Sequence, residues 1–202
     1  YMTPVFTDIR FGKWDNILNT PSVPDAYVYA KMLWHYGRGL AYARQHNFDK
    51  ANSELNMLRA SMSNPQLQEH PDAFNPGIAG AGVAEKLLQG IIAEEMNDLP
   101  GAIDILQDAR DKEDEMIYNE PKDWPHPVRQ YLGNVYLKAG NYAQAEQTYR
   151  QDLKINPNNG WSLSGLATAL KNQNKNKEAT TIKAAAAKAF ERSDIKITTS
   201  VF

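Results

Sequence analysis

The sequence contains no cysteine and no long apolar run, and each absence excludes a class of protein. Without cysteine the chain has no disulfide scaffold, no thiolate nucleophile and no Cys-ligated metal site. No stretch approaches the roughly 18 consecutive apolar residues of a membrane span, and no basic segment followed by an apolar one marks a secretory signal. We therefore expect no membrane span. The compartment stays open, because many secreted proteins also lack cysteine.

Recurrent catalytic and metal-binding motifs are missing as well. The histidines show no His-x-x-x-His or His-Glu-x-x-His spacing, so none forms a local metal-ligand pair: His35, His46, His70 and His126. There is no Gly-x-Ser-x-Gly nucleophile motif, and Gly80-Ala81-Gly82-Val83 lacks the preceding strand and the Lys-Ser/Thr of a phosphate loop. The sequence thus predicts no catalytic residue, no metal and no cofactor, and a protein that is not an enzyme.

The net charge of −2 combines two regions of opposite sign. Residues 1–125 carry 11 Lys and Arg against 19 Asp and Glu, a net charge of −8, whereas residues 126–202 carry 11 against 5, a net charge of +6. Because the whole chain is slightly acidic, we interpret the lysines of the second region as solvated helix faces and expect no nucleic-acid partner. The opposite charges leave self-association open as an alternative, with the acidic region of one copy against the basic region of another.

The feature that is present is an internal repeat. Small residues at Gly133 and Ala145 allow two antiparallel helices to approach, Gly140 suits the turn between them, and Pro157 ends the second helix. Aromatic residues at fixed offsets from Gly133 fill the space between the helices: Tyr136, Tyr142 and Tyr149. This pattern resembles the tetratricopeptide repeat. The resemblance implies an all-α fold, a superhelical solenoid of stacked helical hairpins.

The same frame recurs along the chain. Pairs of small residues lie twelve positions apart at Gly39/Ala51, Gly90/Ala102, Gly133/Ala145 and Ala167/Ala179. The alanines that end these pairs follow one another at 51, 43 and 34 residues, so the first two junctions contain insertions. We expect a single solenoid: a partial repeat over 1–30, repeats over about 32–65, 83–116, 126–159 and 160–193, insertions over about 66–82 and 117–125, and a tail over 194–202. Because residue 1 falls inside a repeat, the frame also predicts an upstream portion of a longer chain.

The insertions and the tail depart from the repeat pattern. Turn residues such as His70-Pro71 and Asn75-Pro76-Gly77 predict a long loop in the first insertion, with Gly80 to Gly82 as a flexible lead into the next helix. Three prolines within 121–127 predict an extended second insertion. The alternating residues Ile195-Lys196-Ile197-Thr198 predict an extended tail that docks on the last repeat.

A looser resemblance covers nearly the whole chain. Three segments, 33–39, 118–129 and 159–163, look like parts of the C-terminal half of a group of larger bacterial tetratricopeptide-repeat proteins whose activity is not established. Arg38 and Gln89 depart from the repeat pattern, because a large apolar residue is usual at both positions. Each polar group therefore either faces a neighbour or binds a ligand.

The repeat class points to binding of a protein or peptide along the concave surface, lined by the first helix of each hairpin. In the last two repeats this surface presents amide, hydroxyl and ammonium groups that suit the carbonyls and carboxylates of a peptide: Gln130, Asn134, Lys138, Ser164, Thr168 and Lys171. The preceding repeat contributes Glu94 and Glu95, so a charge-patterned peptide fits best. Trp124 and Trp161 flank this surface, either as anchors for the peptide or as packing between repeats.

An alternative function is a small-molecule or metal-dependent site. It would lie between the second insertion and the helix expected around residues 33–39, with polar side chains from both as its lining: His35, Arg38, Tyr118, Glu120 and Arg129. This alternative predicts one closed pocket in which these side chains cluster, whereas the scaffold hypothesis predicts an open groove.

Overall fold

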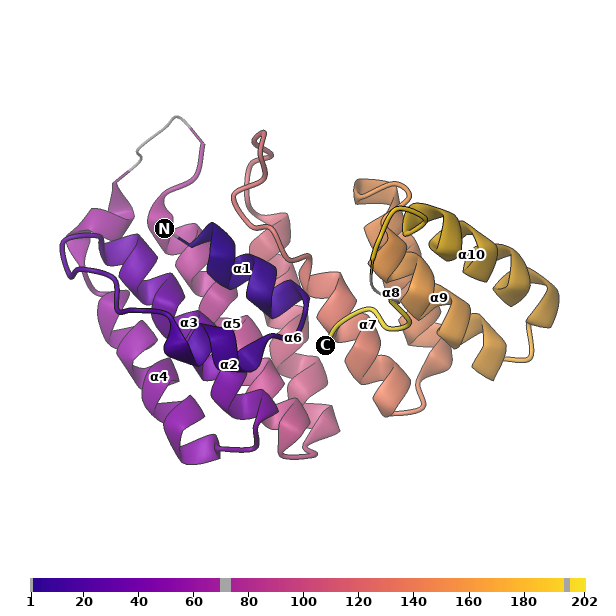
Figure 1. Cartoon of the computed structure of the whole chain (residues 1–202), viewed down its shortest axis with the longest axis horizontal. Helices are drawn as coiled ribbons and strands as arrows, with labels where there is room; N and C mark the ends of the chain where they lie inside the picture. Colours follow the sequence, from indigo (N-terminus) through magenta and orange to yellow (C-terminus); the bar gives the residue numbers. More distant parts are fainter. Residues whose placement is uncertain (1, 70–73, 195–196) are drawn as a thin grey trace. The chain divides into compact units, whose positions relative to one another are not determined.

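The computed structural model describes residues 2–69, 74–194 and 197–202, and within these ranges every regular element is a helix (Figure 1). The elements are, in chain order, α1 (Thr3–Arg10), α2 (Trp14–Asn19), α3 (Val28–Arg44), α4 (Phe48–Ser61), the short 3-10 helix η1 (Pro65–Gln68), α5 (Gly77–Glu95), α6 (Leu99–Asp114), α7 (Val128–Lys138), α8 (Tyr142–Ile155), α9 (Gly160–Asn172) and α10 (Asn176–Ala189). The predicted all-α fold is confirmed. Predictions for His70, Pro71, Ile195 and Lys196 fall outside the described residues.

The α-helices form five hairpins, and each hairpin turns through a residue with positive φ. These residues, with their φ values, are Gly12 (63°), His46 (56°), Asn97 (64°), Gly140 (74°) and Asn174 (61°). The intervals between them are 34, 51, 43 and 34 residues, and the last three equal the intervals between the repeated alanines. A left-handed residue after a helix redirects the chain while it satisfies the last carbonyls of that helix. In two of the hairpins the next helix starts on a side-chain cap: Asn47 accepts a hydrogen bond from the Lys50 amide at 3.3 Å, and Asp98 accepts one from the Gly101 amide at 3.0 Å.

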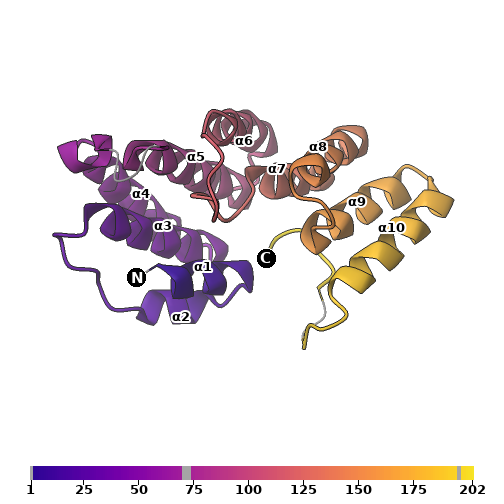
Figure 2. The same cartoon turned by 90° about the horizontal axis from the view of Figure 1, so that it is seen from above.

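The chain divides into two compact units, the first ending at His126 and the second beginning at Pro127. In the first unit α1 and α2 pack on α3, and α5 packs on both α3 and α4; Figure 2 shows α1 and α2 beside α3. In the second unit α9 packs on both α7 and α8, and α10 packs on α9. Within each unit, the first helix of a hairpin therefore lies against both helices of the hairpin before it.

A single tyrosine organises the core of the second unit. Tyr149 is fully buried, and its ring lies so close to α7 and α9 that a Cβ at Gly133 or Gly165 would stand 2.5 or 2.2 Å from the ring carbon Cζ. Its hydroxyl lies 2.7 Å from the Ser200 hydroxyl. Two glycines therefore provide the space in which three helices meet around one ring.

Residues 197–202 of the tail are not helical and pack on the second unit. Ser200 and Val201 are buried, and the Phe202 ring lies edge-on to Trp161 at a centroid distance of 5.7 Å. The end of the tail, from Ser200 to Phe202, therefore contacts the second unit.

Helix α5 begins within the first insertion. The prediction of a flexible lead over Gly80 to Gly82 is wrong, because α5 already begins at Gly77. The glycine serves packing instead: a Cβ on Gly80 would lie 2.3 Å from the hydroxyl oxygen of Tyr29, so glycine lets the tyrosine lie directly on the helix. Among the described residues, no helix has both the length and the apolar character needed to cross a membrane.

Candidate functional site

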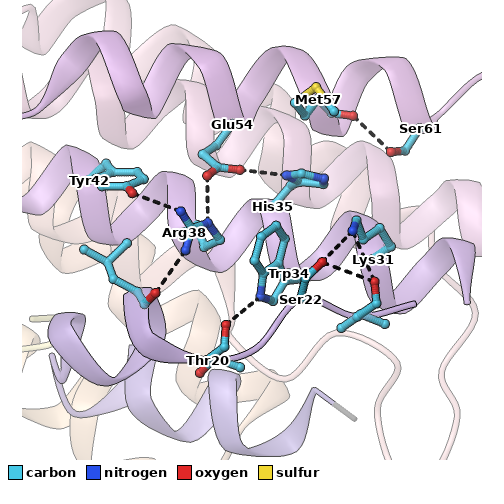
Figure 3. A network of polar contacts seen from close by, with 12 residues as sticks. Thr20, Ser22, Lys31, Trp34, His35, Arg38, Tyr42, Glu54, Met57 and Ser61 are labelled. Carbon is cyan, nitrogen blue, oxygen red and sulfur yellow. Dashed lines mark hydrogen bonds and ion pairs between the residues drawn. The ribbon is translucent and has the colours of Figure 1, made fainter. Parts of the chain in front are cut away.

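Two residues of the alternative site, His35 and Arg38, meet at a carboxylate that the sequence did not single out (Figure 3). His35 Nδ1 lies 2.7 Å from Glu54 Oε2, and Arg38 Nε donates to Glu54 Oε1 at 2.7 Å. The same guanidinium donates to the Leu18 carbonyl at 3.0 Å and to the Tyr42 hydroxyl at 2.9 Å. The cluster joins α3 to α4 and to the end of α2.

Charge and burial indicate a packing role for this cluster. Burial alone would raise the pKa of Glu54, but the hydrogen bonds from His35 and Arg38 outweigh it and lower that pKa. The Arg38 guanidinium also lies 4.6 Å from the centroid of the Trp34 ring. Arg38 therefore faces neighbours of its own unit, which explains its departure from the repeat pattern. Gln89 differs, since its buried Oε1 has no hydrogen-bond partner among the described residues, and nothing in the structure explains this residue.

The other three residues of the alternative site do not join this cluster. The Tyr118 hydroxyl donates to Glu120 in an exposed pair of the second insertion, and Arg129 is a buried residue of α7 in the second unit. His35 lines a cavity of about 330 Å³, and all the other residues that line it lie between positions 25 and 64. Neither Tyr118 nor Glu120 lines this cavity. Within the first unit, His35 and Arg38 therefore share no pocket with Tyr118 or Glu120, because Glu54 on α4 engages the first two while the second two pair with each other.

Both tryptophans expected to flank a binding surface are core residues. Trp124 is 3% exposed, its Nε1 donates to the His126 carbonyl at 2.8 Å, and its ring packs edge-on against Phe6. Trp161 is 9% exposed and lies between the rings of Phe190 and Phe202. Of the two interpretations, packing is the one that the contacts support.

The predicted groove residues divide between the interior and the surface of the second unit. Gln130 is fully buried, and its Nε2 donates to the Ser162 hydroxyl at 3.2 Å, so it does not face a ligand. Asn134 is half-buried and Lys138 is exposed, both on α7. Of the acidic residues of the preceding repeat, Glu94 pairs with Arg44 at 3.3 Å. Of the predicted positions on α7, only Asn134 and Lys138 are accessible.

The remaining three predicted residues, Ser164, Thr168 and Lys171, lie together on one stripe of α9 and line an open groove of about 700 Å³ against α10. The rest of its lining comes from α9, α10 and the tail: Ala167, Asn176, Ala179, Thr180, Lys183, Ala186, Ala187, Phe190, Ile197 and Thr198. The α10 side was missed from the sequence, although Ala179, Lys183, Ala186 and Phe190 already have the spacing of one helix face.

The groove has an apolar floor and a basic edge. Alanines and Phe190 form its apolar part, while Lys171 and Lys183 are exposed. None of the described residues that line it is acidic. The arrangement suits an apolar helix face bordered by carboxylates. Within the described ranges no group of three or more His, Asp or Glu side chains is placed to hold a metal ion.

Comparison with known proteins supports the repeat assignment. The family model described as tetratricopeptide repeat matches residues 128–159, which contain α7 and α8. None of the curated proteins matches the chain. Among solved structures, a crystal structure of MamA protein aligns with TM-score 0.53 and 16% identity over 98% of this chain and 95% of that one. A second, MamA MSR-1 C2, aligns with TM-score 0.52 and 16% identity over 94% of each chain. At this identity the likeness concerns the fold.

Proposed function

We propose that this chain, which carries a tetratricopeptide repeat within a fold of stacked helical hairpins, is a protein-interaction scaffold. Its second unit binds an acidic amphipathic helix between α9 and α10. Helical-repeat proteins of this class present extended surfaces to protein partners. The observation that supports this site is the groove itself, with its alanine floor, its two lysines and no acidic residue among its described lining.

The fold indicates that the occupant is a helix. Three times within the two units, the first helix of a hairpin packs on both helices of the preceding hairpin: α3 on α1 and α2, α5 on α3 and α4, and α9 on α7 and α8. The groove between α9 and α10 is the equivalent place on the last hairpin. Among the described residues only Ile197 and Thr198 of the tail reach it, and they belong to no helix. Small residues on its floor allow another helix to approach closely.

The lysines determine which helix fits. A partner with Glu or Asp beside its apolar face would place carboxylates near Lys171 and Lys183, whereas a basic partner would meet like charges. The Phe190 ring, already packed against Trp161 at 5.6 Å, provides a fixed apolar contact at one end of the groove.

A pair of designed peptides tests this proposal. The first is a 14-residue amphipathic helix with leucines and alanines on one face and glutamates on both borders of that face; its twin carries lysines in place of the glutamates. At low salt the acidic peptide should bind more tightly than its twin. Lys171→Glu with Lys183→Glu should weaken its binding about tenfold, and added salt should weaken it in the wild type.

The control variant is Lys154→Glu with Lys177→Glu, which makes the same charge change at exposed positions outside the groove lining. It should change the affinity less than twofold. Ala187→Trp, which fills the groove from its exposed edge, should abolish binding. Equal affinity for the two peptides, or equal losses in the two charge-reversed variants, would contradict the proposal. So would a concentration-dependent dimer of the chain alone that Ala187→Trp dissolves, because the occupant would then be a second copy.

A further inference from the structure

A second cavity, in the first unit, lies where the two insertions meet. It has a volume of about 480 Å³ and is lined by the first turn of α3, by η1, by the start of α5, by Met116 and by Asp123 of the second insertion. Its floor is apolar, with Leu67 almost fully buried and Tyr29 lying on Gly80. This cavity belongs to neither the Glu54 cluster nor the groove of the second unit.

Specific hydrogen bonds fix the edge of the cavity. Asn75 Nδ2 donates to the Ile117 carbonyl at 2.8 Å and to Asp123 Oδ2 at 2.7 Å, while the Ile117 amide donates to Asn75 Oδ1 at 2.9 Å. One asparagine of the first insertion thus holds two points of the second insertion. It positions the Asp123 carboxylate at the cavity.

The charged groups that line the cavity are all negative. Its charged lining residues are two carboxylates, Glu69 and Asp123, and no Lys or Arg stands among the described residues that line it. Two aromatic side chains, Tyr27 and Tyr29, also line it. Burial, and next the negative charge of Asp123, raise the pKa of Tyr29 to about 12, so its hydroxyl stays protonated at neutral pH.

We propose that this cavity binds a primary alkylammonium group, the chemistry of a lysine side chain or of a free alkyl amine. The alkyl stem lies against Leu67 and the tyrosine rings, where its transfer from water is favourable. The ammonium remains at the edge beside Asp123 and Glu69. Both carboxylates are exposed, so the cation keeps part of its hydration and avoids the cost of full burial. Tyrosine faces add a cation–π attraction.

Three probes of equal length separate the charge from the stem: hexylammonium, hexanol and hexanoate. In the wild-type chain, the backbone NMR signals of Tyr29, Asn75 and Gly80 should shift at a lower concentration of hexylammonium than of either other probe. Hexanoate should require the highest concentration of the three. Asp123→Asn keeps the oxygen that accepts from Asn75 and removes the charge, so it should weaken hexylammonium roughly fivefold and leave hexanol unchanged. Glu69→Gln should have the same direction of effect.

Asp104→Asn is the matched control, because it removes one charge from an exposed position of α6 in the same unit, outside the cavity lining. Hexanoate binding as tightly as hexylammonium, signal changes elsewhere in the chain, or an equal loss in Asp104→Asn would overturn the proposal. Acetyl-Gly-Lys-Gly-amide and its norleucine analogue distinguish the two sources of the cation. If the lysine peptide shifts the same signals, the site accepts a protein side chain; if only hexylammonium does, it accepts a free amine.

Discussion

The two units build similar helical hairpins with different interactions. In the first unit, charged groups join the helices: Glu54 binds His35 and Arg38, Arg44 binds Glu95 at 2.5 Å, and Arg59 donates to Glu85 at 2.8 Å. In the second unit the meeting point of α7, α8 and α9 is one aromatic ring set against two glycines. A junction of charged pairs is stable only when every partner is present, whereas the aromatic junction is stable only when the neighbouring residues leave room for the ring.

The repeat is recognised in one hairpin of the second unit. The family model matches residues 128–159, where Gly133 lies directly against the Tyr149 ring and Ala145 is buried. In the first unit, Arg38 replaces an apolar residue, and its partner Glu54 compensates for it. Such a pair retains the hairpin geometry while it removes the apolar pattern by which the repeat is identified.

The largest expected effect tests the aromatic junction. Gly165→Ala would place a Cβ 2.2 Å from the Tyr149 ring, and because a buried ring cannot move aside freely we expect a loss of about 3 kcal/mol in the stability of the second unit. The matched change in the first unit, Gly39→Ala, meets only the end of the Leu88 side chain. There the helix propensity gained by alanine, about 1 kcal/mol, should offset the cost.

Hydrogen exchange of the full chain, followed separately over α7 to α9 and over α3 to α5, measures both changes. Replacing the ring in the double variant Gly165→Ala with Tyr149→Leu should recover part of the loss caused by Gly165→Ala. Equal losses at Gly165 and Gly39 would contradict the contrast between the units.

The next effect tests the charged junction. Arg38→Met removes three hydrogen bonds and leaves Glu54, whose side chain is only 12% exposed, with His35 alone. We expect the first unit to lose about 2 kcal/mol of stability, measured by denaturant unfolding monitored at Trp34.

Replacing the whole cluster should be milder than breaking it. The triple variant His35→Phe, Arg38→Met and Glu54→Leu substitutes apolar contacts for the ion pairs, and we expect it to be more stable than Arg38→Met alone. If instead the triple variant is the least stable, the cluster contributes more than the mutual satisfaction of its members. Arg150→Met, at a partly exposed pair that joins α8 to Glu178 of α10, serves as the surface control and should cost about 0.5 kcal/mol.

The smallest effect concerns acid. His126 is 3% exposed; burial and then the nearby charge of Arg10 lower its pKa from 6.5 to about 3. Between those pH values the unfolded chain binds a proton that the folded chain does not, so stability falls as the pH drops. The slope is about 1.4 kcal/mol per pH unit. From pH 6.5 to 5.5 the first unit should therefore lose more stability in the wild type than in His126→Leu, as hydrogen exchange would show. The second unit contains no histidine. Parallel pH profiles for the two proteins would refute this assignment.

Prediction from the sequence was most successful where a property is local. Turn residues and the spacing of Gly133, Ala145 and Tyr149 act within one hairpin, so the helical-repeat fold was accessible. The partner of Arg38 could not be predicted, because Glu54 lies on the other helix of its hairpin and carboxylates are common on exposed helix faces. Periodicity along one helix does not state which of several carboxylates a guanidinium reaches.

The candidate sites show the same limit. Ser164, Thr168 and Lys171 share one stripe of a single helix, and the structure places them together in a groove. Gln130, assigned by the same reasoning, is instead covered by α9, because its amide meets Ser162 across the hairpins. The cavity of the first unit depends on Asn75 and Asp123, 48 residues apart, and neither insertion has a periodic pattern that would predict their meeting.

The spacing of the left-handed turn residues indicates how the chain can be lengthened. Every hairpin closes through its own positive-φ residue, and the last two such residues, Gly140 and Asn174, lie one unbroken repeat of 34 residues apart. A segment from one of these turns to the next has the length of one repeat and begins and ends at equivalent positions of the hairpin turn. Duplicating residues 141–174 in tandem should therefore lengthen the array by one hairpin.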